Sequence, residues 1–129
     1  MTFDDGIPDQ CPPDAAEDTP CVVFRATEQD PIQDADLLSW VMLKLPNAKR
    51  HNCRHWGLSV WLSVEAAEHA RDVVPAMKDK YISEGTLLVG DGRYMATPTK
   101  NQPEHCTLWY NKAVDLKPRF SVVMEPENE

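Results

Sequence analysis

Two short segments of the chain hold most of the residue types that can do chemistry. Residues 51–61 and 104–110 carry histidines, hydroxyl groups and tryptophans, many of them two positions apart. In a β-strand every second side chain points to the same face. The apolar set, which includes Trp56 and Leu58, must be buried, so the other set shares the opposite face. Its members are His55, Ser59, Trp61, His105, Thr107 and Trp109.

Such a face differs from an ordinary solvent-exposed sheet, which rarely carries two tryptophans. We therefore expect a binding groove, with Arg50 and Arg54 adding positive charge beside it. Indole rings stack on planar groups, whereas arginine, histidine and hydroxyl groups bind phosphate or carboxylate. Another protein, a nucleotide-like ligand or a short single-stranded nucleic acid would fit this surface. Alternatively, residues 34–45 cover the face, and Trp61 and Trp109 form a second core layer.

A metal site is the next candidate. His51, Cys53 and His55 alternate, and His105 or Cys106 could complete a tetrahedral set of nitrogen and sulfur ligands. However, this spacing matches none of the usual cysteine or histidine metal motifs. We therefore expect neither a bound metal nor another cofactor.

Catalysis is a third candidate. Glu104 and His105, with Ser59 or Thr107, offer an acid, a base and a hydroxyl group. Because Glu104 and His105 are adjacent, they point to opposite sides of a strand and cannot form an acid–base pair by proximity alone.

One order of residue types resembles a known enzyme family. An arginine on an early strand, a serine on a middle strand and a late glutamate, here Arg25, Ser59 or Ser63, and Glu104, resemble the organisation of NAD-using ADP-ribosyl transferases. The resemblance implies a small enzyme acting on a nucleotide or NAD. Each residue also has a plainer role: Arg25 as an edge-strand charge, Ser63 as a helix cap and Glu104 as a loop acid.

The surrounding elements are expected to form an α+β domain, with a small, mainly antiparallel sheet of about five strands and one or two packed helices. Ser63 caps the clearest helix, residues 64–74. Residues 34–45 could be helix or strand, and we favour a helix capped by Asp34. Trp40 and Trp56 are expected in the core. The expected strands are 21–26, 55–62, 93–97, 105–110 and 119–123, with short apolar pieces at 80–83 and 86–89 around Gly85 and a tight turn at 90–92.

Charge and proline divide the chain into three parts. Residues 1–20 contain six acids, four prolines and no base, which predicts a disordered tail, and residues 125–129 predict an acidic C-terminal tail. Residues 21–124 form the single expected globular domain. The net charge of −8 arises from the two ends, because the middle segment sums to about +1.

The sequence also leads to an expectation about the cellular compartment. Neither a signal peptide nor a membrane-spanning stretch is evident, so we expect a cytoplasmic protein without a membrane partner. Its four cysteines are then expected to be free thiols.

Together these features predict a small non-enzymatic binding module that presents the shared face to a protein or a nucleotide-like partner. The alternative is a small nucleotide- or NAD-handling enzyme that uses Arg25, Ser59 and Glu104.

Overall fold

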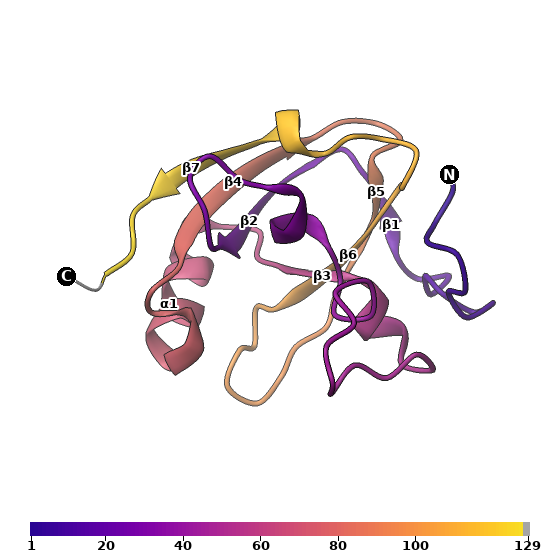
Figure 1. The fold of residues 1–129 in the computed structure, drawn as a ribbon, viewed down its shortest axis with the longest axis horizontal. Helices are drawn as coiled ribbons and strands as arrows, with labels where there is room; N and C mark the ends of the chain where they lie inside the picture. The colour runs from indigo at the N-terminus through magenta and orange to yellow at the C-terminus, as the bar shows by residue number, and fades with distance from the viewer. Residues whose placement is uncertain (128–129) are drawn as a thin grey trace.

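The computed structural model describes residues 1–127, which form two antiparallel sheets and one α-helix (Figure 1). The α+β class and the mainly antiparallel pairing are confirmed, but the described residues form seven strands in two sheets instead of about five in one. The four-stranded sheet has the order β1 (Glu17–Asp18), β5 (Gly92–Ala96), β6 (Cys106–Tyr110) and β3 (Leu58–Val60). The three-stranded sheet has the order β2 (Cys21–Thr27), β4 (Tyr81–Leu87) and β7 (Phe120–Met124).

The main core contains apolar side chains from both sheets. Val23 and Leu87 come from the three-stranded sheet, and Leu58, Val60 and Leu108 from the four-stranded sheet, and none of the five is more than 1% exposed. Backbone hydrogen bonds of 2.7 and 2.9 Å between Phe24 and Trp61 join β2 to the residue that follows β3. The two sheets are therefore connected at one corner, next to Ser59.

Helix α1 (Val64–Val73) packs beside this corner. As expected, Ser63 caps it, since its hydroxyl accepts a hydrogen bond of 3.1 Å from the Ala66 N–H. Alanines 66, 67 and 70 form the buried stripe and contact Trp61 and Ile82. Their small side chains allow the helix to lie close to the indole.

The N-terminal segment covers the Trp109 side of the four-stranded sheet, so the structure does not show the expected disordered tail. Cys11 and Ala16 are buried against Trp56 and Trp109, and a disulfide joins Cys11 to Cys53 with a Cα–Cα distance of 5.6 Å. The acids of the segment also find cations: Asp18 pairs with Arg93 and Asp5 with Lys112. Apolar contacts and the disulfide thus hold the N-terminal segment in place despite its high content of acids and prolines.

The disulfide corrects the expectation of four free thiols, which holds only for Cys21 and Cys106. The expectation of free thiols was drawn from the expected cytoplasmic location, where disulfides are rare. At the other end, the expected acidic tail 125–129 lies partly outside the described residues, which stop at 127.

Residues 34–45 form neither the favoured helix nor the alternative strand. A short 3₁₀ helix, η1 (Asp34–Leu37), is followed by turns, with Gln33 instead of Asp34 at the N-cap. Only part of the segment finds a core: Leu37 and Val41 are buried, while Met42, Leu43 and Leu45 are exposed. Without a continuous apolar surface beneath it, the helical pattern is not realised.

Two further strands differ from their expected bounds. Residues 53–56 form a 3₁₀ helix, η2 (Cys53–Trp56), so β3 begins at Leu58. β4 runs unbroken through Gly85, where a Cβ in its ideal position would lie 2.5 Å from the ring of Phe120. The remaining 3₁₀ helices are η3 (Pro75–Met77) and η4 (Lys117–Arg119). None of the helices in the described residues has the length and apolar character needed to cross a bilayer.

Candidate functional site

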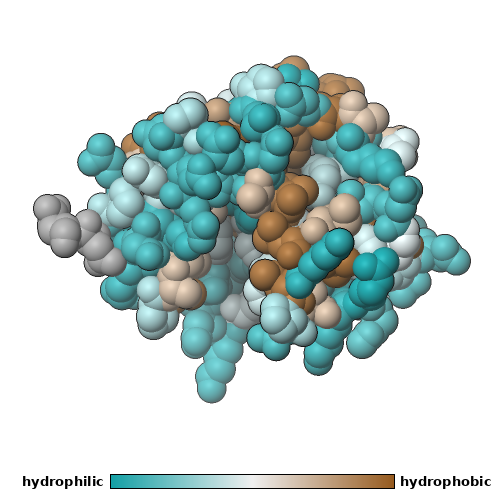
Figure 2. Space-filling view, in the orientation of Figure 1, coloured by the Kyte–Doolittle hydropathy of each residue, from teal (hydrophilic) through white to brown (hydrophobic). Residues whose placement is uncertain are grey.

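A pocket of about 570 Å³ opens where β2, β3 and the start of β6 meet. It is bordered by the turn after η1, by η2, by residues 74–80 and by the loop 99–105. The space-filling view shows a hollow near the middle of this face, with hydrophobic side chains along one border (Figure 2). Six of the eight residues predicted for the binding face line the pocket, namely Arg54, His55, Ser59, Trp61, His105 and Thr107.

The two tryptophans of the predicted face are core residues. Trp109 is 1% exposed and packs beside Trp56, and its Nε1 donates a hydrogen bond of 2.9 Å to the Cys53 carbonyl. Trp61 is 3% exposed and packs against α1. Both indoles are therefore buried, as the second-core-layer alternative expects, but residues 34–45 are not their main cover. Helix α1 covers Trp61, and the N-terminal segment and η2 cover most of Trp109.

Trp40, which was expected in the core, is instead 49% exposed and lines the pocket. Its ring lies 4.9 Å from that of His55, tilted by 55°. The Lys49 N–H donates to His55 Nδ1 at 2.9 Å, so the ring proton of neutral His55 is on Nε2. Burial, followed by the charges of Lys49, Arg54 and His51, lowers the pKa of His55. The pocket mouth thus carries two neighbouring planar rings.

A chain of hydrogen bonds crosses the pocket floor. Ser59 Oγ lies 2.9 Å from His105 Nε2, and His105 Nδ1 lies 2.9 Å from Thr97 Oγ1 and 3.1 Å from the Thr97 carbonyl oxygen. Thr97 Oγ1 lies 2.8 Å from Thr107 Oγ1. Ser59 and Thr107 face each other across β3 and β6, so two regular strands hold the chain in place.

The geometry identifies the tautomer of His105. A carbonyl oxygen can only accept, so the contact with Thr97 places the proton on Nδ1 and leaves Nε2 to accept from the Ser59 hydroxyl. Burial is the largest influence on His105 and lowers its pKa. The bond to Thr97 opposes this shift, while the charges of Arg54 and Arg25 add to it. The imidazole is therefore neutral at neutral pH.

Three cations line the pocket: Arg25, Arg54 and Lys80. Arg25 donates from Nε to the Asp36 carbonyl and from Nη1 to the Ser59 carbonyl, each at 2.8 Å. Burial lowers the pKa of Arg25 to about 10, so it stays charged. Arg54 Nη2 donates to the Thr97 carbonyl at 3.3 Å. Among the described residues, no Asp or Glu lines the pocket, although Lys80 pairs with the exposed Glu28 nearby.

The remaining predicted site residues lie elsewhere. Arg50 stacks over Trp56 at 4.9 Å, on the side of the N-terminal segment. Glu104 is exposed and lines a second hollow of about 320 Å³ together with Ser63. The structure therefore brings Arg25 and Ser59 together but does not add Glu104, so the arrangement that resembles ADP-ribosyl transferases is not assembled in one pocket.

The HNCRH segment does not form a metal site. Cys53 is in the disulfide, and His55 Nδ1 accepts from the backbone. Within residues 1–127, no group of three His, Cys, Asp or Glu side chains could hold a metal ion.

Sequence reasoning missed Trp40 and Lys80, which line the pocket, and Thr97, whose hydroxyl and carbonyl oxygens contact His105. Only Thr97 had a usable signal, because the ends of a loop between antiparallel strands must lie opposite each other. The Thr97 N–H indeed donates to the His105 carbonyl at 2.9 Å. Comparison of the chain with protein-family models, curated proteins and solved structures finds no match.

Proposed function

We propose that the pocket binds a small anionic ligand that carries a planar ring, of which a nucleotide is the simplest example. The observation that supports this proposal most strongly is charge. Three cations line a pocket that contains no carboxylate among its described lining residues, in a chain whose net charge is −8. A concave site lined by one sign of charge concentrates ligands of the opposite sign.

Shape and aromatic character support the same ligand class. The volume of about 570 Å³ is typical of small-molecule pockets. Trp40 and His55 offer planar surfaces at the mouth, where a base could stack. A protein partner fits less well, because Trp61 and Trp109, the two anchors that it would need, are buried.

Titration with AMP, ADP and NAD, followed by calorimetry and by tryptophan fluorescence, tests this proposal. At least one of these ligands should bind with a dissociation constant in the micromolar range. Arg54→Ala should weaken binding by about tenfold, equivalent to about 1.4 kcal/mol, because it removes a charge from the pocket. Trp40→Phe should remove most of the fluorescence change while leaving the fold intact.

Arg50→Ala is the matched control. It removes an exposed arginine from the same segment, but one that lies over Trp56 and outside the pocket. Its dissociation constant should equal that of the unmodified protein. Absence of binding by all three ligands at millimolar concentration, or equal losses in Arg50→Ala and Arg54→Ala, would contradict the proposal.

A further inference from the structure

We propose that Ser59 and His105 are the nucleophile and general base of a hydrolase that cleaves a carboxylic ester carried by an anionic molecule. The inference uses the pocket of the proposed function but does not require the ligand to be a nucleotide. It starts from the 2.9 Å contact between Ser59 Oγ and His105 Nε2 at the pocket floor. This distance lies within the range over which a base removes a hydroxyl proton.

Two contacts of Thr97 and one of Trp61 hold the imidazole of His105 in the orientation of a base. The Nδ1–H group is bound by the Thr97 carbonyl and hydroxyl oxygens, which fixes the tautomer. The edge of the ring meets the Trp61 indole at a centroid distance of 5.6 Å and an interplanar angle of 87°. Thr97 is thus a positioning residue that takes the place of the third member of a nucleophile–base–orienter set.

Access to the cavity distinguishes Ser59 from the other serines of the core. Ser59 is partly exposed and lines the cavity. By contrast, the Thr27–Ser83 pair, 2.8 Å apart, is fully buried. Ser39 also lines the cavity, but it is 1% exposed and its hydroxyl is bound by the Met42 N–H. Among these serines, only Ser59 combines a histidine partner with access to the cavity.

The reaction needs only the ester and water. Ser59 Oγ attacks the carbonyl carbon while its proton moves to His105 Nε2, forming a tetrahedral oxyanion. Collapse breaks the bond to the leaving alcohol, which takes the proton from Nε2, and leaves the acyl group on Ser59. A water molecule then attacks, again giving its proton to Nε2. The acid departs as Ser59 Oγ recovers that proton.

The cations of the pocket serve both the substrate and the oxyanion. The Arg25 guanidinium is held at the backbone of the nucleophilic residue, since its Nη1 donates to the Ser59 carbonyl oxygen, and it lines the same pocket. A cation in this position stabilises the negative charge that develops on the carbonyl oxygen. Arg54 is available for a phosphate or carboxylate group elsewhere on the ester, and Lys80, which pairs with the exposed Glu28, lines the same pocket.

Covalent labelling with a fluorophosphonate, located by peptide mass spectrometry, tests the inference on the full chain. The reagent should form one adduct, at Ser59, and none at Ser39, which serves as an internal control in the same pocket. Ser59→Ala should abolish labelling, and His105→Gln should slow it by about 100-fold or more. Labelling at Ser39 as fast as at Ser59, no label at Ser59, or an equal rate in His105→Gln would overturn it.

The pH dependence of labelling in the unmodified protein provides a second test that needs no variant. The groups facing His105 are Arg25 from β2, Arg54 from η2 and the Thr97 carbonyl, and the net pKa shift is downward. The rate should therefore be constant above about pH 7 and fall below about pH 6.5, as the imidazole takes a proton. A rate that rises steadily to pH 9 would indicate a hydroxyl without a base. Because labelling needs no nucleotide, its failure is distinguishable from failure of the titrations.

Discussion

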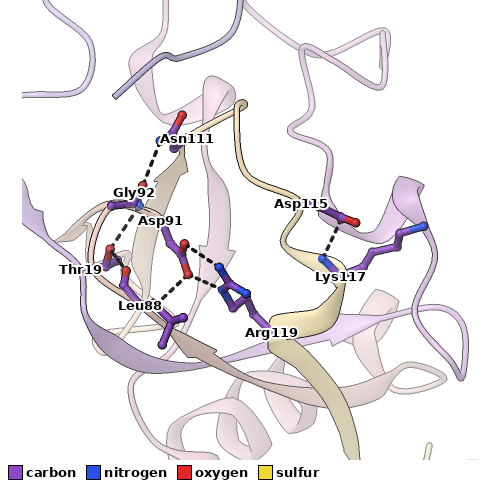
Figure 3. Close-up of polar contacts among 9 residues, drawn as sticks. Thr19, Leu88, Asp91, Gly92, Asn111, Asp115, Lys117 and Arg119 are labelled. Atoms are coloured by element: carbon purple, nitrogen blue, oxygen red, sulfur yellow. Dashed lines mark hydrogen bonds and ion pairs between the residues drawn. The ribbon is translucent and has the colours of Figure 1, made fainter.

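The two ends of β5 each carry a buried polar cluster, and the two clusters are built in opposite ways. Asp91 directly precedes the strand and is 2% exposed. It accepts from the Leu88 N–H at 2.7 Å and from Arg119 Nε at 2.8 Å (Figure 3). Beside it, the Thr19 hydroxyl donates to the Leu88 carbonyl at 2.7 Å and accepts from the Gly92 N–H at 3.2 Å. This cluster is ionic and closed.

Thr97 directly follows the strand and belongs to the cluster with Ser59, His105 and Thr107. That cluster has no carboxylate, its histidine is neutral at neutral pH, and one end opens into the pocket. An ion pair whose carboxylate is bound by an arginine and by a backbone N–H is suited to holding a turn in place. A neutral chain with an accessible hydroxyl is suited to moving a proton. The comparison therefore separates a stabilising cluster from a reactive one, along a single strand.

The largest expected effect concerns the crosslink behind the pocket. The disulfide joins residues 42 positions apart and fixes the N-terminal segment to η2, which carries Arg54 and His55. Reduction should lower the free energy of unfolding by about 4 kcal/mol, from the entropy of a loop of this length. Urea unfolding with and without dithiothreitol measures the difference. The Cys11→Ala/Cys53→Ala variant should not respond to reductant, and equal midpoints for the unmodified protein would contradict the prediction.

This crosslink also shows where sequence reasoning reached its limit. Local patterns predicted local structure: the Ser63 cap, the strand at 21–26 and a tight turn at Gly90, which closes between Leu88 and Asp91, all follow from side chains close in sequence. The burial of Trp109 depends on an N-terminal segment that lies far away in the chain. Its proline and acid content predicts disorder, whereas its apolar contacts and its disulfide to Cys53 form with residues distant in sequence.

The candidate site was predicted in the same partial way. Strand alternation placed Ser59 and Thr107 on one face, and their pairing across β3 and β6 agrees with it. Alternation cannot tell which part of that face stays open, because this depends on segments that cover it from elsewhere. Trp40 was expected in the core as a large aromatic residue, but it lies in turns at the edge of the pocket and is 49% exposed.

Removing the Asp91 carboxylate should have the next largest effect. Asp91→Asn should lower the free energy of unfolding by about 2 kcal/mol at pH 7, because Arg119 and the Leu88 N–H lose a charged acceptor. Burial alone raises the pKa of Asp91, but the hydrogen bonds from Arg119 and Leu88 outweigh it and hold the pKa below its usual value. Its stabilisation is therefore present above about pH 4 and lost as pH falls further.

Urea unfolding at pH 7 and pH 3 measures this dependence, and the difference between Asp91→Asn and the unmodified protein should shrink at pH 3. Asp18→Asn is the control, because Asp18 pairs with Arg93 at the surface, where it is 69% exposed. It should change stability by less than about 0.5 kcal/mol. Neither substitution should affect ligand binding in the pocket. Weaker binding in Asp91→Asn would show that the two clusters do not act independently.

A matched pair of substitutions gives the smallest and most direct comparison. Thr19→Val and Thr107→Val each replace the hydroxyl of a residue that is 2% exposed by a methyl group, near opposite ends of β5. Thr19→Val removes the acceptor of the buried Gly92 N–H and one of the two donors to the Leu88 carbonyl, so it should cost about 2 kcal/mol of unfolding free energy. Thr107 leaves only the Thr97 hydroxyl, which still reaches His105, so it should cost about 1 kcal/mol or less.

Urea unfolding of both variants, with fluorophosphonate labelling in parallel, completes the test. Thr107→Val should label at nearly the normal rate, because the bonds of His105 to Ser59 and to the Thr97 carbonyl do not involve the lost hydroxyl. Thr19→Val should lose more stability and also label normally, since it lies at the closed end. If Thr107→Val costs as much stability as Thr19→Val, the pocket floor is a second stabilising cluster, and the contrast drawn from β5 does not hold.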